Sequence, residues 1–88
     1  MKKYEVGMLA KSKAGHDNGQ IYIIYKVEGA YVYLVDGKSK TIAHPKKKKK
    51  KHVQLILEKN DLIGVDDVGI KRILKLYSKQ SDNINFDK

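Results

Sequence analysis

The residues with the clearest capacity for chemistry are six consecutive lysines, Lys46 to Lys51, followed at once by His52. The ammonium group of lysine is a compact positive charge, and such groups bind nucleic-acid phosphates without reading base sequence. A run of like charges also repels itself, and it is often a solvated segment or, in a nucleated cell, a nuclear localisation signal. Because Pro45 stiffens one end and a strand-like segment follows the other, we favour phosphate contact by a basic loop over residues 45–52.

A second candidate is the polar turn between Gly15 and Gly19, which lies among basic residues. Glycine adopts positive φ angles and lets the backbone approach another surface closely. Backbone N–H groups of such a turn can donate to phosphate oxygens, and Lys11, Lys13 and His16 would add donors nearby. The simpler interpretation is that the two glycines serve only the turn.

The charge balance also favours an anionic partner. The 88 residues contain 19 Lys and Arg against 10 Asp and Glu, a formal net charge of +9, and nucleic acid is the commonest partner of so basic a domain. Cysteine is absent, which excludes disulfides and cysteine-based metal sites and fits a reducing compartment. With no long apolar stretch, we expect neither a membrane span nor a signal peptide, and a cytoplasmic location.

The other candidates for chemistry are weak. His16, His44 and His52 have no zinc-binding spacing, and their basic surroundings oppose a bound cation. The sequence contains neither a nucleophile elbow nor a phosphate-binding GxxxxGK[ST] loop. The adjacent pair Asp66 and Asp67 is better explained as the cap of a helix. We therefore expect no metal, no cofactor, no small-molecule substrate and no enzyme activity.

Short strands must position these residues, because apolar residues alternate through the first two thirds of the chain. In the segment 20–27 the alternation places Ile21, Ile23, Tyr25 and Val27 on one face. The tyrosines are expected mainly to pack, with base stacking on exposed rings as the alternative. Tight turns are predicted at residues 28–29 and 36–37. The predicted strands are residues 6–10, 20–27, 30–36, 40–43 and 52–57.

A helix is predicted after these strands, from about Asp67 to Gln80. Residues 81–88 lack periodicity and are expected to form a disordered tail. Five short strands with tight turns suit a small, bent β-barrel, and the helix would cover apolar surface that so small a barrel cannot bury alone. The apolar stripe of the helix is Val68, Ile70, Ile73, Leu74 and Tyr77, and Lys71, Arg72, Lys75 and Lys79 lie largely on its other side.

The segment VGMLAKSKAGHDNGQIYII, residues 6–24, resembles the KOW motif of ribosomal proteins and transcription-elongation factors. The motif has an apolar–glycine start, an alternating strand, a turn with two glycines about four positions apart, and an apolar strand. DGKSKTIAHPKKKKKKHVQLI, residues 36–56, looks like the segment that follows the motif in a family of small bacterial KOW proteins. That family is similar to an archaeal and eukaryotic large-subunit ribosomal protein. The matching motif positions are Gly7, Ala10, Ser12, Gly15, Gly19 and the strand from Ile21.

The resemblance covers residues 5–57 and implies a mainly β fold, a small SH3-like β-barrel of about five strands with a C-terminal α-helix. It divides the chain into three parts. Residues 1–58 form the barrel and include the basic loop, residues 59–80 form a loop and a helix that packs on the barrel, and residues 81–88 form the tail. It also implies binding to RNA, foremost ribosomal RNA, with ribosomal proteins as further contacts, and we expect a monomer. The alternative is an SH3-like protein-interaction module of transcription or translation, whose helix docks a partner. The expected RNA-binding residues are Lys11, Lys13, Gly15, His16, Gly19, Lys38, Lys40, Lys46, Lys47, Lys48, Lys49, Lys50, Lys51 and His52.

Overall fold

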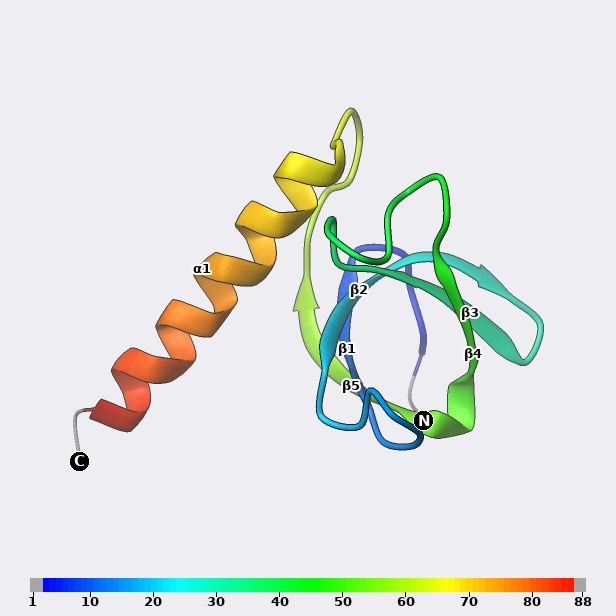
Figure 1. Ribbon diagram of the computed structural model, residues 1–88, viewed down its shortest axis with the longest axis horizontal. Coiled ribbons are helices and arrows are strands. Elements are labelled where there is room, and N and C mark those ends of the chain that lie inside the picture. The colour runs from blue at the N-terminus through cyan, green and yellow to red at the C-terminus, as the bar shows by residue number, and fades with distance from the viewer. Residues whose placement is uncertain (1–2, 87–88) are drawn as a thin grey trace.

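The protein is mainly β, with five antiparallel strands in one sheet and a single α-helix after them (Figure 1). A computed structural model describes residues 3–86, with side chains described for residues 3–79. The strand order is β4-β3-β2-β1-β5. The predicted fold class is thus confirmed. The elements are β1 (Met8–Ser12), β2 (Ile21–Glu28), β3 (Tyr31–Val35), β4 (Lys46–Lys49), β5 (Val53–Lys59) and α1 (Asp67–Phe86).

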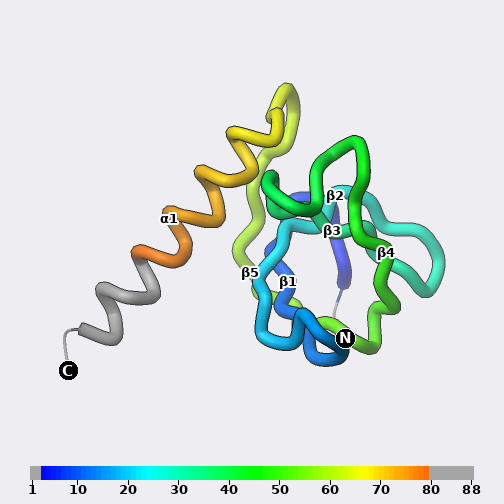
Figure 2. The backbone as a smooth tube through the Cα atoms, in the orientation of Figure 1, coloured from blue at the N-terminus to red at the C-terminus, as the bar shows by residue number. Residues whose placement is uncertain are grey.

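The sheet is strongly curved, because its two edge strands follow one another in the chain. A 3-10 helix, η1 (Lys50–His52), is the whole connection between β4 and β5. The tube in Figure 2 shows the chain bending round from β4 to β5 through this short segment. Hydrogen-bonded ladders connect β4 to β3 and β5 to β1, and none among the described strands connects β4 to β5. The curvature brings residues from both edges close to the turn that follows β1.

Each face of the sheet buries its own apolar cluster. On the outer face, Leu9, Ile23 and Val35 are fully buried, and α1 covers them through Ile70, which is also fully buried. Burial of the apolar stripe of α1 holds the helix against the sheet, as the sequence predicted. Val68, which was predicted to belong to this stripe, is instead 56% exposed. The cluster on the inner face consists of Met8, Ala10, Tyr22, Ile24, Val32, Leu34, Val53 and Leu55.

The strand predicted at residues 40–43 is not formed. The carboxylate of Asp36 accepts the backbone N–H groups of Lys38 at 2.9 Å and Lys40 at 2.8 Å. The N–H of Ile42 donates to the side chain of Asp67 at 2.9 Å. Carboxylates therefore take the backbone donors that a neighbouring strand would have taken, and they hold the segment as a loop against the start of α1.

A β-bulge changes which residues of β2 share a face. The pairing register between β2 and β3 shifts between Ile24 and Lys26, so that one extra residue is inserted in β2. Val27 consequently pairs with Val32 and packs against the inner cluster. The prediction that it shares a face with Ile23 is wrong, because a one-residue insertion reverses the alternation after it.

The helix begins as predicted and continues further than predicted. The carboxylate of Asp66 accepts the N–H of Gly69 at 2.9 Å, which is the bond of an N-cap residue. The helical backbone extends beyond Gln80 to Phe86, because no glycine or proline interrupts it. Of the predicted disordered tail, residues 81–86 are therefore helical, and residues 87–88 lie outside the described part of the chain. Within that part, no helix is long and apolar enough to cross a membrane.

Candidate nucleic-acid interface

The lysine run forms a strand and a 3-10 turn where the sequence predicted a basic loop over residues 45–52. Lys46–Lys49 is β4, paired antiparallel with β3, and Lys50–His52 is η1. Successive side chains of a strand point to opposite faces, so neighbouring ammonium groups are directed apart. Pairing with β3 also gives the backbone of β4 its hydrogen-bond partners. These two effects allow six like charges to remain in regular structure.

The alternation divides the lysines into two sets. Lys46 and Lys48 lie on the inner face, and their side chains are 32% and 10% exposed. Lys47 and Lys49 lie on the outer face and are exposed, as is Lys51 in η1. The outward set is placed to meet a ligand, whereas the inward set has partners within the protein.

Asp17 of the turn after β1 is the partner of the inward set. The hydroxyl groups of Ser12 and Tyr22 each donate to its carboxylate at 2.8 Å. Lys48 Nζ donates to the same carboxylate at 3.0 Å, and Lys46 Nζ lies 3.4 Å from it. Asp17 therefore fixes the turn to β4. The sequence had indicated only a turn residue there, because its lysine partners lie about thirty positions further along the chain.

The electrostatics of this cluster keep Asp17 ionised. Burial raises the pKa of Asp17, but hydrogen bonds from Lys48, Tyr22 and Ser12 outweigh burial and hold the pKa far below its usual value. Burial, followed by the hydrogen bond to the anionic Asp17, raises the pKa of Tyr22 well above its usual value. The Tyr22 hydroxyl thus stays protonated and donating. The cluster keeps one fixed negative charge opposite two lysines.

Replacement of Asp17 by asparagine is expected to lower the free energy of unfolding by about 1.5–3 kcal/mol at pH 7, the usual contribution of hydrogen bonds to a charged group. Since the pKa of Asp17 is lower in the folded state than in the unfolded state, its contribution is complete above pH ~4 and is lost as the pH falls below that value. Urea unfolding across pH 7 to 2.5 measures both effects.

The stability difference between wild type and Asp17→Asn should therefore shrink in acid. Glu58→Gln, which neutralises an exposed carboxylate, serves as the control and should change stability by less than about 0.5 kcal/mol. A difference that stays constant from pH 7 to 2.5 would show that ionised Asp17 does not stabilise the fold.

The turn between Gly15 and Gly19 has the predicted backbone geometry but uses some of its own donors. Both glycines have positive φ, 86° and 93°. The N–H of Asn18 donates to the carbonyl of Gly15 at 3.2 Å, and the N–H of Gly19 donates to that of Ser12 at 2.8 Å. The N–H of Asn18 is therefore bound within the turn, and the expectation that it faces phosphate is wrong. The N–H of Gly19 is likewise bound to a carbonyl of the protein.

The turn nevertheless lies directly beside the lysine segment. The N–H of Lys13 donates to the carbonyl of His52 at 2.8 Å, and Lys48 Nζ donates to that of Ala14 at 2.9 Å. Lys13 and His16 are exposed here. The structure thus brings together most of the predicted RNA-binding residues, namely Lys13, Gly15, His16 and the whole run from Lys46 to His52.

Three predicted residues line a groove between α1 and the sheet, and one of them, Gly19, also ends the turn after β1. Lys11, Gly19 and Lys38 line this groove of about 830 Å³ together with Lys71 and Lys75 of α1. The two helix lysines were predicted only to lie on the side of the helix opposite its apolar stripe. Their spacing of four residues, which places them on one side of a helix, is the feature that could have identified them.

Lys38 and Lys40 were expected to bind RNA together with the lysine run. The structure does not group them with that run. Lys38 belongs to the wall of the α1 groove, whose described lining includes no residue of β4 or η1. Lys40 is half-buried, and its N–H is bound to Asp36. The loop after β3 thus places Lys38 in the groove beside α1.

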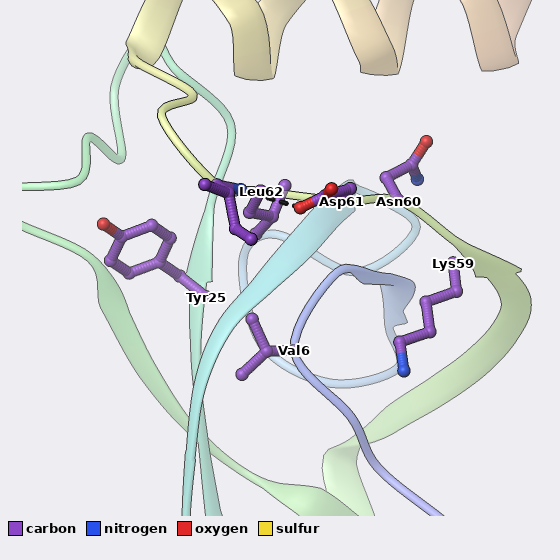
Figure 3. Close-up of a pocket in the computed structure, with 7 residues that line it drawn as sticks. Val6, Tyr25, Lys59, Asn60, Asp61 and Leu62 are labelled. Carbon is purple, nitrogen blue, oxygen red and sulfur yellow. Dashed lines mark hydrogen bonds between the residues drawn. The ribbon is translucent and has the colours of Figure 1, made fainter.

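A second hollow, of about 730 Å³, lies under the segment that leads from β5 to α1 (Figure 3). Val6, Tyr25 and Leu62 supply its apolar lining. Asp61, beside them, accepts the N–H of Ile63 at 2.9 Å, as the dashed line in Figure 3 marks. The carboxylate of Asp61 thus stabilises the turn between β5 and α1.

The histidines do not assemble into a metal site. Among residues 3–79, no three His, Cys, Asp or Glu side chains lie close enough to hold a metal ion. His16 lies on the turn after β1, His44 in the loop before β4, and His52 at the end of η1.

A comparison of the chain with models of protein families found no match, and neither did a search of curated proteins. The resemblance to small KOW proteins therefore stays a hypothesis. The surface formed by β4, η1 and the adjacent turn is the part of the molecule that indicates a function.

Proposed function

We propose that the protein is an RNA-binding module that contacts phosphates through the outward lysines of β4 and η1 and through the Gly15–Gly19 turn. The observation that carries this proposal is that Lys47, Lys49 and Lys51 lie in regular structure with their side chains exposed. Regular structure already orders the backbone of these lysines, so that binding restricts only their side chains, whereas in a mobile loop the backbone must be ordered as well.

The local charge supports an anionic ligand. Asp17 is the carboxylate that faces the inner side of β4, and it pairs with Lys46 and Lys48. The outward lysines Lys47, Lys49 and Lys51 do not share in this neutralisation. A surface with three such cations attracts phosphate and gives a binding constant that depends strongly on salt.

The resemblance to KOW proteins favours ribosomal RNA as the ligand, with ribosomal proteins as neighbours, a monomer as the acting form and the cytoplasm as the compartment. The protein-interaction alternative used the apolar stripe of the helix to dock a partner. Ile70, at the centre of that stripe, is fully buried against the sheet. The alternative therefore lacks this surface, and RNA binding remains the better proposal.

The test is the salt dependence of RNA binding by wild type and a Lys47→Gln, Lys49→Gln, Lys51→Gln variant. Fluorescence anisotropy with a labelled RNA oligonucleotide at 50–300 mM salt gives the slope of log K against log salt. If each lysine neutralises one phosphate of a single strand, the slope should become shallower by about 0.7 per lysine, or about 2 in total. Affinity at low salt should fall accordingly.

A matched variant, Lys46→Gln with Lys48→Gln, removes lysines from the inward set. This variant should lose stability, because Asp17 loses its partners, and its salt slope should change less per lysine than that of the outward variant. An unchanged slope in the outward variant would refute the assignment of these lysines to phosphate contact.

A further inference from the structure

The outer face of β3 presents two tyrosine rings that neither apolar cluster of the described residues includes. Tyr31 and Tyr33 are half-buried and share a face of β3 with Val35. α1 covers the Val35 end of that face, and in Figure 1 the helix runs away from β4. Packing of the core thus does not account for the two rings, although the sequence favoured a structural role for both.

Lysines from both neighbouring strands flank the rings. Tyr33 pairs with Lys26 of β2 on one side and with Lys47 of β4 on the other, and Tyr31 pairs with Lys49. Lys47 Nζ lies 4.4 Å from the centre of the Tyr31 ring, and Lys26 Nζ lies 5.2 Å from that of Tyr33. In each of these cation–π contacts the ammonium group lies over one face of the ring, which leaves the other face for a stacked base.

The surface carries a net positive charge. Glu28 is the carboxylate among these residues; it accepts the Tyr33 hydroxyl at 2.9 Å and lies 3.9 Å from Lys26 Nζ. Lys47 and Lys49, on the other side of the two rings, are exposed. Aromatic rings set among cations are the combination that binds single-stranded nucleic acid, because bases stack on the rings while cations meet the phosphates.

We infer that this surface, which consists of Tyr31, Tyr33, Lys26, Lys47 and Lys49, stacks unpaired bases of an RNA strand. The inference rests on the proposed function and specifies its ligand as RNA with unpaired nucleotides, in preference to a continuous duplex. Other RNA-binding folds stack two or three bases on aromatic residues of a sheet in this way. Stacking accepts every base, so the surface selects unpaired RNA without reading its sequence.

The test compares wild type, a Tyr31→Leu, Tyr33→Leu variant and a Tyr31→Phe, Tyr33→Phe variant. Each is titrated with a 12-nucleotide oligouridine and with a 12-base-pair RNA duplex. The leucine variant should bind oligouridine at least about tenfold more weakly, which corresponds to about 1.4 kcal/mol. The phenylalanine variant keeps both rings and should stay within about twofold of wild type. Salt slopes should be equal in all three, because the lysines are unchanged.

Thermal unfolding shows whether the leucine variant is folded. A second measurement needs no variant: ring-proton resonances of Tyr31 and Tyr33 in wild type should shift on addition of oligouridine, since a stacked base changes their magnetic environment.

Three results would overturn the inference. One is a folded leucine variant that binds oligouridine as wild type does. Another is wild-type binding to duplex as tight as to the single strand, and the third is ring-proton resonances that do not move at saturation. If these occur while the Lys47, Lys49 and Lys51 variant still loses salt dependence, only the stacking is refuted. Wild type that binds neither RNA would refute the stacking and the proposed function together.

Discussion

Replacement of Ile70 by alanine is expected to lower the free energy of unfolding by about 2–5 kcal/mol, the usual cost of truncating a buried isoleucine. Ile70 is fully buried and joins α1 to Leu9, Ile23 and Val35 on the outer face of the sheet. A small domain has only about 5–15 kcal/mol of stability in total, so this loss is a large part of it. Urea unfolding followed by circular dichroism measures the change.

Val68→Ala is the matched control, because it also replaces a β-branched residue in the first turns of the helix. Both substitutions gain the higher helix propensity of alanine, but Val68 is 56% exposed. The control should change stability by less than about 0.5 kcal/mol. Equal effects of the two substitutions would mean that α1 does not pack on the sheet, and would restore the alternative in which its apolar stripe docks a partner.

Replacement of Gly7 by alanine is expected to cost about 3 kcal/mol or more. Gly7 has φ of 96°, and a Cβ added there would overlap the backbone carbonyl oxygen of Asn60. The N–H of Gly7 donates to Ile24 at 2.8 Å, and its carbonyl accepts the N–H of Asn60 at 2.9 Å. Relief of the overlap must therefore disturb the bond to Ile24 within β2 and the bond to Asn60, the residue after β5, in addition to the strain of the positive φ.

Gly29→Ala separates these two costs. Gly29 also has a positive φ, 57°, but a Cβ there would meet no atom within 4 Å. This variant should lose only the roughly 1–2 kcal/mol of the left-handed conformation. Thermal unfolding of the two variants gives the comparison, and equal losses would show that close approach to Asn60 contributes nothing.

Much of the fold could be predicted because its strands and helix follow local rules. β2 and β3 were predicted to within one residue from alternation and from the turn between them. The cap at Asp66 and the apolar stripe around Ile70 followed from helix periodicity. These features depend on residues a few positions apart, which a sequence pattern can reveal.

The errors arise where a distant residue decides the local structure. Lys46–Lys49 forms a strand because β3 pairs with it and Asp17 accepts two of its ammonium groups, and neither partner is a neighbour in sequence. Residues 40–43 form no strand because the distant Asp67 takes the N–H of Ile42, while Asp36, four positions before Lys40, takes the N–H of that residue. Local charge repulsion predicted a loop for the lysine run, which forms a strand. Local alternation predicted a strand for residues 40–43, which form a loop.

The residue types of the candidate site could be predicted from the sequence. The division of its lysines into an inward and an outward set could not. Composition indicated that Lys47 and Lys48 would bind alike, and only the alternation of β4 directs one outward and the other to Asp17. The grouping of Lys11 and Lys38 with α1 depends on where the helix packs. Such assignments need the three-dimensional path of the chain.

The position of β4 at the margin of the sheet has a consequence for the unbound protein. Its ladder pairs it with β3 on one side only, so the other side presents backbone donors and acceptors that could recruit a strand from another molecule. Four successive lysines oppose such recruitment, because two cationic margins repel one another. We therefore expect the lysines of β4 to hinder strand-to-strand aggregation of the unbound protein, which would give their charge a role independent of any ligand.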